Sequence, residues 1–507
     1  MGRLRLGLFV VIISQFIQFS RLLFSLGGAF AAEPFPLSEV EIYARCYTKL
    51  TRQVPSESAP VFAELQAGRV RASDECMKLV DMAKFDAAGK LTDPANATAR
   101  AVLRSFHDIH LSWFKSKSAE GGERADFAIR DFEEPALYLT RAMFGAQPYS
   151  SIVTSTNSLR GARIVDGSSI NRFLQQDFLR YNQEEIDYGY GAESALTTRY
   201  PNWELIAGKY RAREEAYTFA DNTLVSVGDL IGVEALSPLA MPPTRILGLS
   251  AVTPDSWKLA IEGYEKNYKI FVHAGGGILG SETYMLSNTN VSHLQVPSDY
   301  DVIHRRLAGR IFEDLLCHEL PTLNIADVQG LVIPDSKHAF QRSTSCMQCH
   351  ASLDPLAFTY RNQFWAKTGN PNQVGVGMTM IYRLPASDTH PIFAAQPPRG
   401  VLHYRPLLQG APVIQNVNDI AGTGAAFAGS RDLYLCAAKK YYFEYTGIDV
   451  QLSSIEPTAN AVRAFHQNEV IRLGDSLRSH QSLRRLVRDI FLSPAFTSRD
   501  FKRTEPK

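Results

Sequence analysis

The feature that most constrains this chain is a short motif, Cys346-Met347-Gln348-Cys349-His350. On a helical turn the two cysteines and the histidine share one side of the helix, because residues three and four positions apart are neighbours there. Two thiols placed in this way form thioethers with the two vinyl groups of one haem, and the adjacent imidazole binds the iron from the same side. The motif therefore predicts one covalent haem c, attached through Cys346 and Cys349, with His350 as the proximal ligand.

Two other kinds of site use a similar cysteine spacing and stay open at this point. A redox-active thiol pair usually follows a strand in a thioredoxin-like βαβ unit, whereas the polar Thr344 and Ser345 precede this motif. A zinc site needs a second pair of ligands, and the nearest one, Cys317-His318, has an irregular spacing. We prefer haem attachment to both.

The first residues of the chain have the pattern of a secretory signal. A basic start with Arg3 and Arg5 precedes an apolar run at 8–19, and a small-x-small site at 29–31 follows. We interpret residues 1–32 as a bacterial Sec-type signal peptide and expect a periplasmic or secreted protein. An uncleaved membrane anchor is the alternative, but Arg21 would be costly inside a span. No comparable run follows, so we expect no stable membrane insertion after cleavage.

The composition is that of a globular protein, since 45% of the 507 residues are hydrophobic and 21% are charged. The formal net charge is only +1, which gives no reason to expect a nucleic-acid partner. The length suffices for about three domains of ordinary size.

The apolar residues recur mostly with helical spacing, and strand-like alternation is scarce. The clearest helical stretches are 99–115, 303–315, 431–446 and 481–492. Residues 366–430 are rich in glycine and proline and predict loops.

We therefore predict a mainly α, multi-domain protein with a loop-rich, cytochrome c-like haem domain. The proposed boundaries give an N-terminal helical domain at 33–265, a haem domain at 266–415 and a C-terminal helical domain at 416–507.

The ligand on the other side of the iron is not determined by the motif. Met378 and Met380 follow His350 by 28 and 30 residues in a glycine-rich stretch, and we name them as the candidates. His338, His390 and His403 are the alternatives. For the second ring nitrogen of His350 we expect a backbone carbonyl at Pro355 or a neighbouring residue.

The residues around the motif resemble a known family. The stretch 346–358, CMQCHASLDPLAF, is similar to the signature C-x-x-C-H-x-x-[IL]-D-P-x-[GA]-F of the planctomycete-type cytochrome c domain proteins. These are exported bacterial proteins of three domains, with the haem motif in the middle one. After Phe358 the chain departs from the family, which usually continues with an acidic segment containing Asn-Phe-Asp. The resemblance implies electron transfer to a redox partner protein whose identity is unknown.

Four cysteines lie outside the motif, and an exported chain with an even number of spare thiols invites pairing. The resembling family often has cysteines at the places of Cys317 and Cys436, which implies a bond between them. Cys46 and Cys76 would then pair with each other. Four buried free thiols are the alternative.

Two functions follow from these observations. The first is an exported mono-haem c-type cytochrome that transfers electrons. The second is a haem-containing enzyme, or a substrate- or scaffold-binding protein, whose main activity lies in residues 33–265, because a bare carrier needs only one domain. The sequence leaves open whether the protein is an enzyme.

Overall fold

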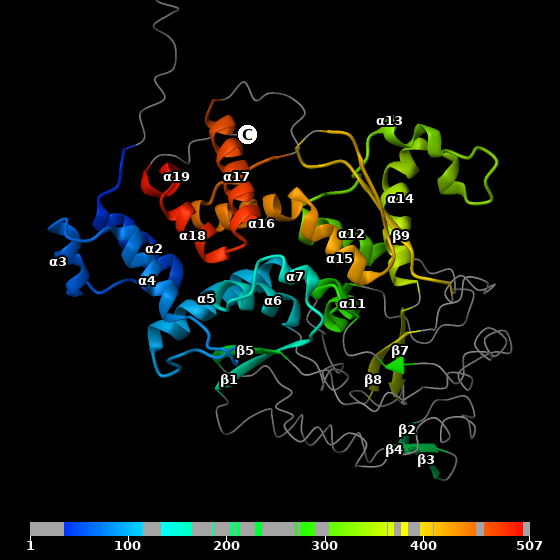
Figure 1. The fold of residues 1–507 in the computed structure, drawn as a ribbon, viewed down its shortest axis with the longest axis horizontal. Coiled ribbons are helices and arrows are strands. Elements are labelled where there is room, and N and C mark those ends of the chain that lie inside the picture. The colour runs from blue at the N-terminus through cyan, green and yellow to red at the C-terminus, as the bar shows by residue number, and fades with distance from the viewer. Residues whose placement is uncertain are drawn as a thin grey trace, which may run out of the picture.

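The described part of the chain is mainly α-helical, as the sequence predicts (Figure 1). The structure is a computed structural model, and the signal segment 1–32 lies outside the residues it describes. These residues are 35–114, 133–164, 185–186, 203–206, 209–212, 229–235, 269–270, 274–288, 304–361, 363–369, 377–383, 396–408, 410–452 and 461–499.

The N-terminal helices begin where the sequence supplies caps. Ser38 and Glu41 form a capping box at the start of the helix Glu39–Thr51. Asn96 accepts a hydrogen bond from the backbone N–H of Ala99 at the start of the helix Ala97–Trp113. The helices of this region are α2 (Glu39–Thr51), α3 (Pro60–Gln66), α4 (Ala72–Met82), α5 (Ala97–Trp113), α6 (Glu134–Phe144) and α7 (Ser151–Thr154).

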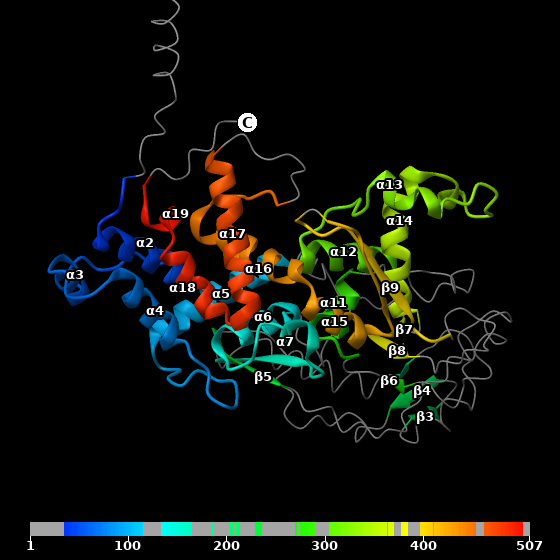
Figure 2. The same ribbon diagram turned by 45° about the horizontal axis from the view of Figure 1, so that its top comes forward.

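The C-terminal helices pack against the N-terminal ones, so the two ends of the described chain lie side by side (Figures 1 and 2). The backbone N–H of Leu37 donates to the carbonyl of Thr497 at 2.8 Å, and the Arg45 guanidinium lies 4.7 Å from the centre of the Phe496 ring. These helices are α15 (Ile420–Gly429), α16 (Arg431–Thr446), α17 (Ala461–His480), α18 (Leu483–Phe491) and α19 (Pro494–Thr497). The stretches 431–446 and 481–492 are therefore helical as predicted.

The middle of the chain contributes helices that lie away from α2, α3 and α4 (Figures 1 and 2). The predicted helix at 303–315 is α12 (Arg305–Leu316), and the motif helix is α14 (Thr344–Ala357). The shorter elements are η5 (Gly277–Gly280), α11 (Glu282–Asn288), α13 (Ile325–Val328), η7 (Gln329–Leu331), η8 (Ala339–Arg342) and η9 (Phe358–Tyr360).

The strands form small antiparallel sheets of two or three strands each: β1 with β5, β9 with β10, β2 and β3 on either side of β4, and β6 and β7 on either side of β8. Their bounds are β1 (Leu159–Ile164), β2 (Glu185–Ile186), β3 (Trp203–Ile206), β4 (Lys209–Ala212), β5 (Asp229–Ala235), β6 (Lys269–Ile270), β7 (Gln363–Gly369), β8 (Gly377–Arg383), β9 (Gly400–Tyr404) and β10 (Val413–Val417).

The prediction of loops over 366–430 is wrong for the described residues of that range, which hold most of β7, all of β8, β9 and β10, and α15. Three of the glycines that suggested loops lie at strand ends. Gly369 pairs with Gly377 in the β7–β8 ladder, and Gly400 begins β9. A Cβ at Gly400 would come within 2.4 Å of the Pro355 carbonyl oxygen, so glycine allows β9 to pack closely on α14.

Two apolar clusters hold the described chain together. The larger is one continuous cluster that includes residues from Ile42 on α2 to Phe496 on α19. We call the helices α2–α7, α11, α12 and α15–α19, which contribute to this cluster, the main body. The smaller consists of Leu323, Val328, Met347 and Ala351, and we call residues 322–351 around it the motif module. The proposed domain boundaries at 265 and 415 remain predictions.

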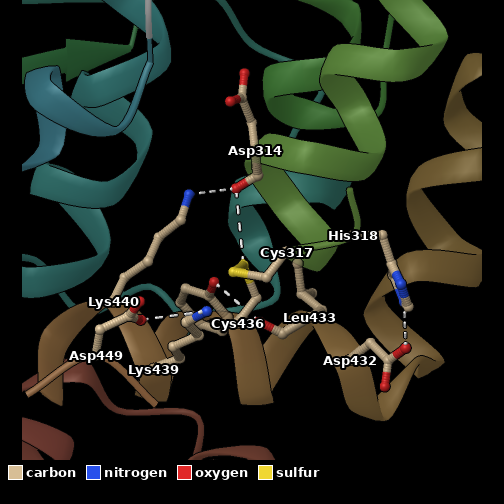
Figure 3. Close-up of a disulfide and its surroundings, with 10 residues drawn as sticks. Asp314, Cys317, His318, Asp432, Leu433, Cys436, Lys439, Lys440 and Asp449 are labelled. Atoms are coloured by element: carbon tan, nitrogen blue, oxygen red, sulfur yellow. Dashed lines mark hydrogen bonds and ion pairs between the residues drawn. A yellow bond between two sulfur atoms is a disulfide. The ribbon is translucent and has the colours of Figure 1, made fainter. Parts of the chain in front are cut away.

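Two disulfides lie in the main body, at both predicted pairings. Cys46–Cys76 joins α2 to α4 with a Cα–Cα distance of 6.1 Å, and Cys317–Cys436 joins the end of α12 to α16 at 5.2 Å. Figure 3 shows the second bond between two buried polar contacts, Lys440 Nζ to the Asp314 carbonyl oxygen at 2.6 Å and His318 Nε2 to the Asp432 carboxylate at 2.8 Å.

Among the described residues, no helix is both long enough and apolar enough to cross a bilayer.

Candidate haem-attachment site

The C-x-x-C-H motif occupies the first turns of α14, which begins after the extended residue Ser343. Cys346 is exposed, Cys349 is partly buried, and neither takes part in a disulfide. The His350 side chain is 25% exposed. The helix thus brings the three predicted residues together on neighbouring positions of one surface.

The Nδ1 atom of His350 lies 3.3 Å from each carboxylate oxygen of Asp354, one helical turn further along. A carboxylate has no proton to donate, so the hydrogen bond requires the proton to be on Nδ1. The Nε2 atom is then left with a lone pair, which is the form in which a histidine binds a metal. We expected a backbone carbonyl near Pro355 as the partner of this nitrogen. The partner is instead the Asp354 carboxylate, because residue i+4 on a helix lies beside residue i.

Arg305 and Phe340 complete the surroundings of His350. The Phe340 ring stacks on the imidazole, with 4.2 Å between ring centres and 22° between planes. Arg305 binds Asp354 through two hydrogen bonds, Nε to Oδ1 at 2.5 Å and Nη2 to Oδ2 at 2.9 Å. Its guanidinium carbon lies 5.1 Å from the centre of the Phe340 ring. The imidazole is therefore fixed both in its plane and in its tautomer.

A pocket of about 700 Å³ lies beside His350. This volume falls within the range of about 300–1,000 Å³ that is usual for small-molecule and cofactor sites. The polar residues in its lining, besides His350, are Arg305, His338, Gln341, Asp354 and His403. The apolar ones are Leu331, Phe340, Met347, Ala351, Pro355, Phe358 and Val401. The two thiols are not among the lining residues, whereas Met347 and His350 of the motif are, so these two residues connect the motif with the pocket.

The candidates for the second iron ligand fall into two groups. His338 and His403 line the pocket. Met378 and Met380 lie on β8, opposite Thr368 and Ala366 of β7, but their side chains are outside the described residues.

His390 also lies outside the described residues. The assignment of Met378 or Met380 therefore remains a prediction.

Burial shifts two titratable groups near the motif. Burial lowers the pKa of His403 and so favours its neutral imidazole, whereas the Ala351 carbonyl and Asp327 act in the opposite direction and raise this pKa. Burial, together with the neighbouring Cys346, raises the pKa of Cys349. A raised thiol pKa disfavours the thiolate, which is the reactive form in thiol redox chemistry.

Sequence reasoning did not identify Asp354, Arg305 and Phe340. The spacing of four residues between His350 and Asp354 is a signal that was available, because a helix had been expected there. Arg305 lies 45 residues before His350 in the chain and on another helix, so only the tertiary structure shows its role.

Within the described ranges, no group of three or more His, Cys, Asp or Glu side chains is arranged to hold a metal ion. No family model matches this chain, and no curated protein or solved structure shows significant similarity to it.

Proposed function

We propose that this chain is an exported mono-haem c-type cytochrome, which holds one haem c covalently and transfers electrons. The observation that carries the proposal is the distribution of its six cysteines. Four are paired in disulfides, and the two that stay free are Cys346 and Cys349 of the C-x-x-C-H motif. Haem attachment requires two such unpaired thiols, because each forms one thioether.

The two disulfides support export from the cytoplasm. Disulfides persist in oxidising compartments such as the bacterial periplasm and are rare in the reducing cytosol. Together with the signal-like segment at 1–32, they support a periplasmic or secreted location. The resemblance of 346–358 to the planctomycete-type cytochrome c domain proteins supports the same assignment.

The residues around the motif fit a covalent haem. Cys346 and Cys349 would hold the ring, and His350 would bind the iron through Nε2, since Asp354 keeps the proton on Nδ1. Phe340 and Met347 supply apolar walls to the pocket beside this ligand. Haem bound in this way supplies one-electron chemistry, with a potential set by its ligands and surroundings.

The pocket favours a second candidate, a haem enzyme or sensor that takes up a small molecule. Arg305, His338 and His403 line it together with apolar side chains, which is the usual character of a small-molecule site. An absorption spectrum separates the two candidates. A low-spin, six-coordinate iron that does not bind carbon monoxide or cyanide favours electron transfer, whereas a position that binds these ligands readily favours the enzyme or sensor.

The attachment itself is tested by producing the full chain in a bacterial periplasm with a haem-ligation system. The protein is expected to keep its haem through acid–acetone extraction and denaturing electrophoresis, and the double variant Cys346→Ala/Cys349→Ala is expected to lose it. The matched control is Cys46→Ser/Cys76→Ser, which removes two cysteines away from the motif and should retain covalent haem. Haem that extracts freely from the unmodified protein would refute the proposal.

A further inference from the structure

His350 is held by three residues from different parts of the chain: Asp354 from its own helix, Arg305 from the start of α12, and Phe340 from η8. Asp354 and Phe340 contact the imidazole, and Arg305 contacts both of these residues, since it binds the Asp354 carboxylate and lies over the Phe340 ring. Such mutual contacts fix the position of each group more firmly than separate contacts to His350 would.

We propose that Asp354 and Arg305 act as a pair of positioning residues that set the reduction potential of the protein through the Nδ1 proton of His350. The inference rests on the proposed function, because it concerns the group that His350 would bind. Neither residue would touch the iron, and both would act through the imidazole.

Asp354 lowers the potential. Its carboxylate accepts the hydrogen bond from Nδ1 and so makes the imidazole a stronger electron donor at Nε2 than a backbone carbonyl would. A stronger donor and a nearby negative charge both stabilise the oxidised, more positive form of the iron. The Asp354 side chain is only 11% exposed, so water screens this effect weakly.

Arg305 opposes Asp354. Its two hydrogen bonds to the same carboxylate place a positive charge beside it and withdraw part of the electron density that would otherwise act on Nδ1. The potential would therefore reflect a balance between the two residues, and removing either one should shift it in the opposite direction from removing the other.

The test is spectroelectrochemical titration of the haem-loaded full chain. Asp354→Asn keeps the shape of the side chain and removes its charge, and we expect a higher potential. Arg305→Gln leaves the carboxylate uncompensated, and we expect a lower potential. Asp354→Glu retains a carboxylate, so its potential should lie closer to that of the unmodified protein than to that of Asp354→Asn.

The matched control is Asp475→Asn. Asp475 lies on α17 in the main body and forms the same kind of two-bond pair with Arg431, with both bonds at 2.7 Å. The control should leave the potential unchanged.

An unchanged potential in Asp354→Asn, or a shift of the same sign in Asp354→Asn and Arg305→Gln, would overturn the inference while the covalent haem still supports the proposed function. If Asp354→Asn fails to mature, Arg305→Gln decides: a lower potential supports the inference, and an unchanged or higher potential overturns it. Absence of covalent haem from the unmodified protein would instead refute the proposed function.

Discussion

The main body and the motif module are stabilised in different ways. In the main body, helices from both ends of the chain share one continuous apolar core, and two disulfides connect them. The motif module has a core of only four residues, Leu323, Val328, Met347 and Ala351, and no disulfide. Helix α14 belongs to both regions, because its later residues Leu353, Leu356 and Ala357 lie in the core of the main body.

The comparison shows where a covalent cofactor would add most to the stability of this fold. A small apolar core supplies little stabilisation, and small structural units usually need a cross-link or a bound group to become well ordered. The main body is stabilised by its own apolar core and disulfides. The motif module has a small core and holds the two free thiols. Attachment of a haem would therefore add a cross-link and apolar surface to the region that has fewer of both. The following predictions test this contrast, starting with the largest expected effect.

Removal of the disulfide between α12 and α16, with Cys317→Ser/Cys436→Ser, should lower the free energy of unfolding of the main body by about 5 kcal/mol. The bond closes a sequence separation of 119 residues. Without it the unfolded chain gains conformational entropy, and this gain lowers the free energy of unfolding. Urea unfolding followed by far-ultraviolet circular dichroism measures it. Covalent haem content serves as the control and should not change. A loss below about 1 kcal/mol would show that the core alone holds these helices together.

The other disulfide should matter less. It closes a separation of only 30 residues, so Cys46→Ser/Cys76→Ser is expected to cost about 4 kcal/mol in the same urea experiment. The difference between the two variants, roughly 1 kcal/mol, comes from loop length alone. A larger loss at Cys46–Cys76 than at Cys317–Cys436 would contradict this ordering.

A pH-dependent contribution should arise in the main body from Asp314. Burial raises the pKa of Asp314 to about 6, although Lys440, Arg310 and Tyr284 favour its charged form. The folded state therefore binds this proton more tightly than the unfolded state does. As the pH rises from about 3 to about 7, the stability of the unmodified protein should fall by about 3 kcal/mol relative to Asp314→Asn.

The comparison with Asp314→Asn is informative because asparagine can still accept the 3.0 Å hydrogen bond from the Tyr284 hydroxyl. Unfolding free energies of both proteins at a series of pH values provide the measurement. Parallel pH profiles of the two proteins would rule out a raised pKa at this position.

In the motif module, Leu323→Ala should lower stability by about 2 kcal/mol, because Leu323 is 2% exposed and its truncation leaves a cavity in a small core. The loss should be confined to the module. Hydrogen exchange of the haem-free protein is expected to accelerate in the first turns of α14 and to stay unchanged in α16.

Leu435→Ala is the matched control in the main body, where Leu435 is fully buried on α16 and packs against Gly474 of α17. This variant should accelerate exchange throughout the main body. If Leu323→Ala did the same, the motif module would not be a separate unit of stability.

Helical elements were the most predictable part of the fold. The apolar spacing and the glycine after the last turn predict a helix at 431–446, and α16 has these bounds. The expectation of loops over 366–430 was wrong because glycine is equally suitable at the end of a short strand, as at Gly369, Gly377 and Gly400. These strands pair with the next strand in the chain, β7 with β8 and β9 with β10, and their stability depends on cross-strand contacts that the pattern of a single strand does not contain.

The sequence alone determined the chemistry that the chain can carry at its motif, because the spacing of Cys346, Cys349 and His350 acts within two turns of one helix. It also contained the spacing that places Asp354 on the same side as His350. The tertiary structure decided what surrounds them: Arg305 from α12, Phe340 from η8 and His403 from β9 come together only when separate elements pack. Local spacing is set by helix geometry, whereas contacts between elements depend on the packing of the whole core.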